Sequence, residues 1–319
     1  MKIVPFIFAA AVLGVSPGIG AQQYPVKPVR IIVPFAPGGG SDFIARFTAQ
    51  RLSGSFGAQV IVENRPGAGG MLGIEAGVKA DADGYTFTLI ASSYTVNPAL
   101  YALKYDPVND ITPVVQISQG PMLVVVNAKL PAKNAAELIK LAKARPGALN
   151  FASAGQGSIT HMACELFAHM AGIKMNHVPY KGTGPALTDT ISGQTDLLCA
   201  STATALAHVK SGRLRAVAVT TATRLPAEPE VPTLAESGVK GYDVALWHGL
   251  IAPKGMPKFA VDKMNAEVNK LLKAKDAGEQ LQNDGVSPKG GTPEAFRNQI
   301  RKEIDLWKKT VAATGVKAE

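Results

Sequence analysis

The feature that most constrains this chain is a short apolar run that passes through a glycine loop into a helical pattern, and it occurs twice. The first copy spans residues 29–52 (VRIIVPFAPGGGSDFIARFTAQRL) and the second spans residues 149–171 (LNFASAGQGSITHMACELFAHMA). In each copy the apolar run has the length of a buried strand, and the apolar residues after the loop recur at helical spacing. Strands that alternate with helices are typical of α/β proteins with a largely parallel sheet.

The alternation continues along the chain and restarts midway, which indicates two α/β lobes with a cleft between their glycine loops. The chain has 319 residues, 46% of them apolar, whereas single hydrophobic cores stop growing at about 250–300 residues. We expect the chain to cross between the lobes near residues 119–122 and again near residues 242–244. Lobe 1 then comprises residues 24–121 plus 243–319, and lobe 2 comprises residues 122–242.

The N-terminus has the pattern of a secretory signal peptide over residues 1–21. Lys2 is followed by an apolar stretch over residues 3–15 and by small residues up to Ala21, where cleavage is expected. The stretch is too short to span a membrane, which takes about 20 apolar residues. A buried N-terminal helix is the alternative. The signal-peptide interpretation predicts an exported protein.

Charge and cysteine content exclude several classes of protein. There are 33 Lys and Arg against 24 Asp and Glu, but the basic residues are scattered, so no nucleic-acid partner is expected. A net positive charge suits an anionic ligand. The two cysteines, Cys164 and Cys199, are too few for a disulfide scaffold or a four-cysteine metal site. In an oxidising compartment they are candidates for one disulfide, and two buried thiols are the alternative.

Both glycine loops have the properties of an anion-binding site. A strand that ends at the start of a helix presents unpaired N–H groups and the positive end of the helix dipole. Gly39 is expected to let the backbone approach a ligand and to adopt a dihedral that bulkier residues avoid, while Ser41 and Ser158 add hydroxyl donors. The nearest cation is Arg46, which is placed to pair with Asp42 one helical turn away. Two ordinary strand-to-helix turns are the alternative.

The sequence contains no complete motif for catalysis or for cofactor binding. The GxGxxxG pattern at residues 67–73 departs by one residue from the dinucleotide fingerprint, and the sequence has neither a phosphate-binding loop nor a nucleophile elbow. His161, Glu165 and His169 share a helix face but lack the HExxH pattern and a further ligand. We therefore expect no metal and no cofactor.

Several short motifs occur in one order along the predicted mature chain. VRIIVPF and PGGGSD are followed by ENRPGAGG at residues 63–70, DGYT at residues 83–86, VPYKG at residues 178–182, and Trp247 with Gly249-Leu250. This ordered set resembles the tripartite tricarboxylate transporter receptor family, the TctC/Bug solute-binding proteins. The resemblance implies an α/β, two-lobed periplasmic-binding-protein (type II) fold with a cleft between the lobes and two hinge crossings.

The resemblance also implies that the protein binds a ligand and catalyses no reaction. We expect a monomeric periplasmic receptor that captures a small organic mono- or dicarboxylate and delivers it to a membrane permease of the tripartite tricarboxylate type. The alternative is an exported α/β hydrolase or isomerase acting on a carboxylate substrate, with Ser158 and His161 at its centre, although no acid partner for this pair is evident. A signalling module that reports its ligand state to a membrane sensor is a third possibility.

In the family that the chain resembles, the loops matching residues 36–42 and 153–161 pinch one carboxylate, partly through bridging water. Carried over to this sequence, the residues of the two loops that form the ligand-binding set are Ala36, Gly39, Ser41, Asp42, Ser153, Gly157, Ser158 and His161. Residues expected nearer the variable distal pocket are Ser92, Tyr180 and Thr202. Ala200-Ser201 stands where some relatives carry Asp-Gln, so distal specificity does not transfer. A packed turn residue is the alternative role for Tyr180.

Overall fold

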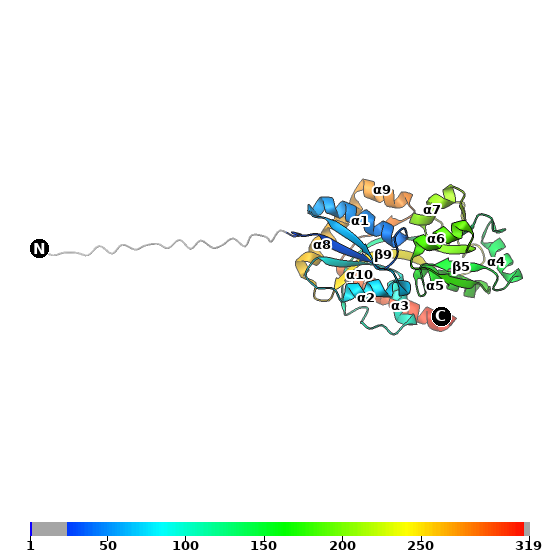
Figure 1. The fold of residues 1–319 in the computed structure, drawn as a ribbon, viewed down its shortest axis with the longest axis horizontal. Coiled ribbons are helices and arrows are strands. Elements are labelled where there is room, and N and C mark those ends of the chain that lie inside the picture. The colour runs from blue at the N-terminus through cyan, green and yellow to red at the C-terminus, as the bar shows by residue number, and fades with distance from the viewer. Residues whose placement is uncertain (2–23, 316–319) are drawn as a thin grey trace.

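The computed structural model describes Met1 and residues 24–315 (Figure 1). The signal-peptide prediction for residues 1–21 therefore falls, apart from Met1, outside the described residues. The described chain alternates strands and helices along its length, which confirms the α/β prediction. Within these residues no helix is both long enough and apolar enough to cross a membrane.

The first sheet combines strands from the beginning, middle and end of the chain. Its strands are β1 (Val29–Val33), β2 (Val60–Asn64), β3 (Thr86–Ala91), β9 (Ala245–Pro253), the first part of β4 (Ile111–Asn127) and the short β10 (Ser287–Pro288). β1 pairs in parallel with β2 and β3, whereas β9 is antiparallel to both β3 and β4. The helices of this part are α1 (Gly40–Phe56), η1 (Ala68–Gly70), α2 (Met71–Val78), α3 (Ser93–Leu100), α8 (Lys258–Lys273), α9 (Lys275–Asn283) and α10 (Pro293–Thr314).

The second sheet is built from the middle of the chain. Its strands are β5 (Asn150–Ser153), β6 (Asn176–Pro179), β7 (Leu197–Ser201), β8 (Leu214–Val219) and the second part of β4. β5 pairs in parallel with β6 and β7, and β4 is antiparallel to β7 and β8. The helices of this part are α4 (Ala135–Ala144), α5 (Ile159–Ala171), α6 (Thr183–Ser192) and α7 (Thr202–Lys210).

The strand β4 belongs to both sheets and joins them. Its residues up to Pro121 pair with β9, and its residues from Met122 onward pair with β7 and β8. The second passage between the sheets precedes β9, where the N–H of Val244 still donates to Thr220 O at the end of β8 (2.8 Å). The exact bounds of the two lobes stay a prediction.

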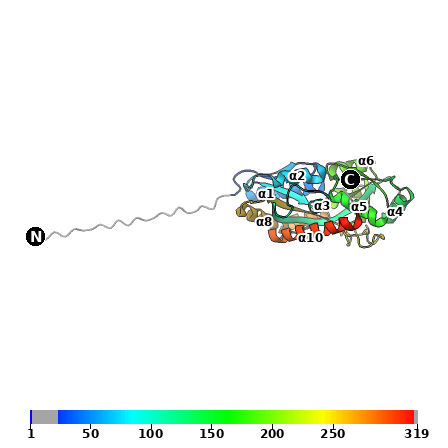
Figure 2. The same cartoon turned by 90° about the horizontal axis from the view of Figure 1, so that it is seen from below.

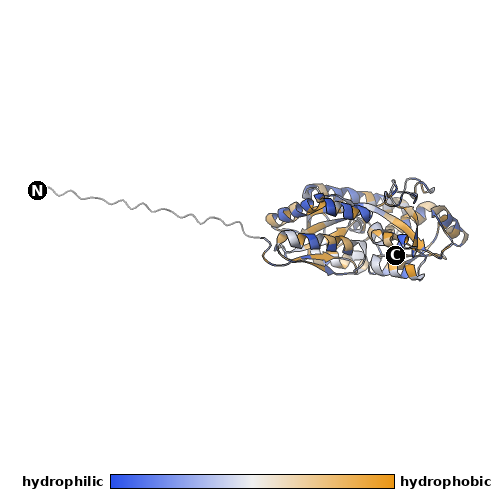
Figure 3. Cartoon of the chain, turned by 90° about the horizontal axis from the view of Figure 1, so that it is seen from above, coloured by the Kyte–Doolittle hydropathy of each residue, from blue (hydrophilic) through white to orange (hydrophobic). Residues whose placement is uncertain are grey.

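Helix α10 packs against both halves of the molecule. Phe296, Ile300 and Ile304 lie in one buried cluster with Trp247 on the first sheet, whereas Trp307 belongs to the core of the second sheet. Figure 2 shows the helix running along one face of the molecule beneath both groups of strands. Hydrophobic residues colour the strands and hydrophilic residues colour much of the outer helices in Figure 3, as expected for amphipathic helices on a buried sheet.

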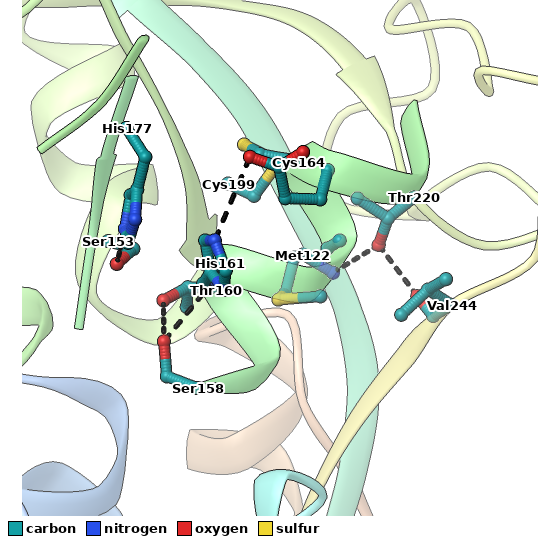
Figure 4. The surroundings of a disulfide bond; sticks show 12 residues. Met122, Ser153, Ser158, Thr160, His161, Cys164, His177, Cys199, Thr220 and Val244 are labelled. Carbon is teal, nitrogen blue, oxygen red and sulfur yellow. Dashed lines mark hydrogen bonds and ion pairs between the residues drawn. A yellow bond between two sulfur atoms is a disulfide. The ribbon is translucent and has the colours of Figure 1, made fainter. Parts of the chain in front are cut away.

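The two cysteines form a disulfide that ties α5 to β7 (Figure 4). The Cα atoms of Cys164 and Cys199 are 5.9 Å apart, and both residues are fully buried. The bond therefore fixes the helix that starts at the second glycine loop onto the sheet beneath it.

Candidate functional site

A small central cavity lies between the two halves of the molecule, and the starts of four helices surround it. Three lining residues open α1, three open α5, and α6 and α7 contribute one each. We call it the central cavity; its volume is about 20 Å³, and its lining residues are Phe35, Gly39, Gly40, Ser41, Ala91, Ala154, Ser158, Ile159, Thr160, Thr183, Ser201, Leu246 and His248.

The helix starts around the central cavity leave backbone donors available. In the described part of the chain, the residues Gly39, Gly182 and Ser201 that precede α1, α6 and α7 provide no side-chain cap. Only α5 is capped, by Ser158, whose Oγ accepts a hydrogen bond from the N–H of His161 at 3.3 Å. Uncapped N–H groups and converging helix dipoles favour an anion at this point.

The polar side chains of the lining are neutral. Ser41 and Ser158 from the two glycine loops face the same cavity as Ser201, and neither Lys nor Arg belongs to the lining that the structure describes. His248 also lines the cavity, but complete burial lowers its pKa to about 3, so it carries no charge at neutral pH. An anion in the central cavity therefore meets hydroxyl groups, backbone amides and an imidazole rather than a cation.

The loops on the two sides of the central cavity touch each other through glycines. The N–H of Ala36 donates to Lys181 O at 2.9 Å. A Cβ atom on Gly184 would lie 2.5 Å from Pro37 O, and one on Gly39 would lie 3.3 Å from the Thr183 side chain. We call this contact the glycine seam. The two loops are therefore in direct contact here, and a side chain larger than the hydrogen of glycine would hold them apart.

Gly39, Ser41 and Ser158 lie in the central cavity, and Ala36 lies beside it at the glycine seam. The dihedral argument for Gly39 is wrong, because its φ of −96° is extended backbone that other residues also adopt. A larger residue there would instead make a tight contact with Thr183, whose side chain would lie 3.3 Å from the new Cβ atom.

Asp42 supports the first loop from outside the cavity. Its carboxylate accepts hydrogen bonds from the N–H of Gly38 (3.0 Å), from Asn64 Nδ2 (2.9 Å) and from Arg46 Nε (2.9 Å). Burial alone would raise the pKa of Asp42, but the hydrogen bonds and the charge of Arg46 outweigh burial and lower it. The Asp42–Arg46 pair, expected from the sequence, thus fixes the loop backbone.

His161, Gly157 and Ser153 form a layer behind the second loop. His161 Nδ1 accepts the N–H of Gly157 at 3.2 Å, and the His161 ring stacks on His177 with centroids 3.9 Å apart. Ser153 Oγ lies 2.6 Å from His177 Nε2 (Figure 4). Burial, helped by His177, lowers the pKa of His161 to about 3. These neutral rings hold the loop in shape and are not part of the cavity lining.

The three residues expected at the distal pocket are engaged elsewhere. Ser92 Oγ accepts the N–H of Trp247 at 3.4 Å, and Thr202 Oγ1 donates to Gly285 O at 2.9 Å. Tyr180 donates its hydroxyl to Asp189 at 2.6 Å, and burial together with this bond raises the tyrosine pKa to about 12. The structure does not place these three in the central cavity.

Four polar residues that line the cavity are absent from the ligand-binding set predicted from the sequence: Thr160, Thr183, Ser201 and His248. A signal for Ser201 and Thr183 existed, because each stands where a strand or loop gives way to a helix. No comparable signal marks His248, which lies inside strand β9.

Solved structures of high similarity cover almost the whole chain. The structure of the periplasmic binding protein BugD matches with a TM-score of 0.90 and 33% identity, over 93% of this chain and 100% of that one. Rpa4515 from Rhodopseudomonas palustris with adipate matches with a TM-score of 0.89 and 35% identity (92% and 99% covered). MatC from the same organism, with bound malate, matches with a TM-score of 0.87 and 32% identity (90% and 100% covered).

The family model described as "Tripartite tricarboxylate transporter family receptor" matches residues 44–316. The model and the structures together confirm the resemblance drawn from the ordered motifs and the two-lobed α/β fold of periplasmic binding proteins. The family consists of solute-binding receptors rather than enzymes. The chain belongs to the tripartite tricarboxylate transporter receptor (TctC) family.

Proposed function

We propose that this protein is a periplasmic receptor that captures a small mono- or dicarboxylate between its lobes, with one carboxylate group at the helix starts around the central cavity, and delivers it to a membrane permease of the tripartite tricarboxylate type. The observation that carries the proposal is the convergence of four helix starts on a cavity lined with neutral donors. Relatives bound to adipate and to malate support the carboxylate class, and the family supports the permease.

A carboxylate suits this set of donors. Its two oxygens accept several hydrogen bonds at once, and charge-assisted bonds from backbone N–H groups are about twice as strong as neutral ones. A site without a cation also releases its ligand without having to break a buried ion pair. This property fits a receptor that must hand over its cargo.

The hydrolase alternative lacks the geometry that it needs. Ser158 Oγ contacts the N–H of His161 and the hydroxyl of Thr160 (3.0 Å). The His161 ring instead accepts from Gly157 through Nδ1, and its Nε2 lies 3.7 Å from Glu165. A nucleophile requires its base within hydrogen-bond reach, and the base here faces away from the hydroxyl.

We further propose that the lobes comprise residues 24–121 plus 243–319 and residues 122–242. The change of partner within β4 after Pro121 supports the first crossing, and the end of the β8 contact at Val244 supports the second. The last turns of α10, which pack on the second sheet through Trp307, then form a contact between the lobes.

Calorimetry tests the function. We expect the protein to bind at least one of succinate, malate, adipate, butyrate and hexanoate stoichiometrically and without turnover. Ser158→Ala should weaken that binding about tenfold to a hundredfold, since one hydrogen bond to a charged group contributes about 1.5–3 kcal/mol. Ser211→Ala, at the exposed far end of α7, is the matched control and should bind as the wild type does. Turnover of a bound acid, or equal binding by both variants, would contradict the proposal.

A further inference from the structure

His248 lies on β9 at the floor of the central cavity and is almost fully buried, with 3% of its surface exposed. It stands directly opposite Ser118 of β4 in the antiparallel pairing, and Ser118 Oγ lies 3.2 Å from His248 Nδ1. The other ring nitrogen, Nε2, has no hydrogen-bond partner among the described residues. Buried polar atoms without a partner are rare, and each requires an explanation.

The hydrogen bond with Ser118 determines which nitrogen carries the proton. The only side-chain bond that the described structure gives the fully buried Ser118 hydroxyl is the one to His248. If the imidazole donated, the hydroxyl proton would be left without an acceptor, at a cost of about 1–3 kcal/mol. Ser118 therefore donates to Nδ1, and the neutral ring carries its hydrogen on Nε2.

His248 lines the central cavity, and its Nε2–H group is a hydrogen-bond donor for which the described residues provide no acceptor. The hydroxyl of Ser201 lies at the same end, since a Cβ atom on Gly40 would meet both Ser201 Oγ (2.7 Å) and His248 Cε1 (3.9 Å). Burial keeps the pKa of His248 at about 3, so the ring remains a neutral donor throughout the physiological pH range.

We propose that the Nε2–H group of His248 binds an acceptor oxygen of the solute that lies outside its first carboxylate group. The group would thereby select acids that carry such an oxygen. This inference rests on the proposed function and goes further by naming a residue that determines specificity: His248 would favour a dicarboxylate or a hydroxy acid over a plain monocarboxylate. The first carboxylate is held by the helix starts, and the second oxygen meets His248. Ser118 acts as a positioning residue because it fixes the ring tautomer.

The test compares matched acids on matched variants by calorimetry. Adipate is compared with hexanoate, and succinate and malate with butyrate, so that the acids of each comparison share a chain length and differ in the second carboxylate, with a hydroxyl added in malate. The combined variant Ser118→Ala, His248→Phe removes donor and partner together and keeps a ring in the space. His248→Gln restores an N–H near the position of Nε2.

In the wild type we expect the most tightly bound of succinate, malate and adipate to bind about tenfold to a hundredfold more tightly than the monocarboxylate of the same length. In the double variant the affinity for the acid with the second polar group should fall more than the affinity for the monoacid, so that the preference is lost, and His248→Gln should regain part of it. Ring nitrogen NMR of the wild type should show the hydrogen on Nε2. Thermal unfolding of each variant confirms that it is folded.

Two results separate this inference from the function on which it rests. If Ser158→Ala weakens binding but the double variant keeps the full preference for the second oxygen, His248 has no such role and the receptor function stands. If no acid of the panel binds the wild type, both proposals fail. A hydrogen found on Nδ1 would also overturn the role of His248 as donor.

Discussion

His161, His177 and His248 are held as neutral imidazoles, the first two as a stacked pair behind the second glycine loop and the third in the central cavity. Burial lowers the pKa of His161 and of His248 to about 3 and that of His177 to about 4. Charging any of them would leave a cation in a site built for a neutral ring. The stability of the fold therefore depends on pH through these residues.

The sign of that dependence follows from the pKa values. The unfolded chain binds protons on histidine below about pH 6.5, whereas the folded protein does not until about pH 3–4. The free energy of unfolding should thus fall as pH drops from 6.5 toward 4, by up to about 1.4 kcal/mol per pH unit for each histidine. Urea unfolding at pH 7, 6 and 5 measures the slope. The Ser118→Ala, His248→Phe variant should flatten it, and equal stability at pH 7 and pH 5 would refute the argument.

Single residues also show where sequence reasoning succeeds and fails. Ser41 and Ser158 were predicted because each stands at the start of a helix after a glycine loop, a local pattern that fixes their position. His248 and Ser118 meet through pairing between strands 130 residues apart, and no local pattern predicts such a meeting. The role of Tyr180 in binding, carried over from the family, stays a prediction; in the structure its hydroxyl donates to Asp189.

At the scale of elements, both copies of the strand, loop and helix pattern form as predicted. By contrast, β4 is a single strand of 17 residues, and the expected crossing near residues 119–122 falls inside it. Pro113, Gly120 and Pro121 interrupt the apolar pattern of the first part. Pairing with β9 maintains the strand through these residues.

The start of helix α6 supports a prediction about closure. Gly184→Ala should weaken binding of the best-bound acid of the panel by about tenfold or more, because the new Cβ would lie 2.5 Å from Pro37 O across the glycine seam. The same clash lies within the folded structure, so the free energy of unfolding should also fall, and the preference of about 1 kcal/mol of a helix for alanine over glycine should offset that loss only in part. Gly54→Ala in α1 is the control, because its Cβ meets no atom within 4 Å. Unchanged affinity in Gly184→Ala would show that the seam does not close on the ligand.

The disulfide between α5 and β7 should contribute to stability through the chain that it closes. Replacing both Cys164 and Cys199 by serine should lower the free energy of unfolding by about 3–4 kcal/mol, because the bond spans 35 residues. Denaturant unfolding of the variant and of the reduced wild type should give the same loss. Two free thiols titrated in unreduced, denatured protein would contradict the bond.

At the scale of the whole molecule, the fold brings four helix starts to one point from two sheets that share β4. Helix α10 packs on both sheets (Figure 2) and so opposes their separation. The length of the chain and its alternating pattern were sufficient to predict two lobes. The shared strand and the bridging helix were not predicted, because they depend on contacts between distant segments.

The central claim is that a carboxylate is held in the central cavity without a cation. A crystal structure of the protein with the acid of the panel that binds most tightly tests it directly. We predict one carboxylate within hydrogen-bond distance of the first backbone N–H groups of α1 and α5, with no Lys or Arg nitrogen within about 4 Å. An acid bound in the separate hollow behind α5 that includes Lys174 and Asn176, or one paired with a Lys or Arg side chain, would contradict the account.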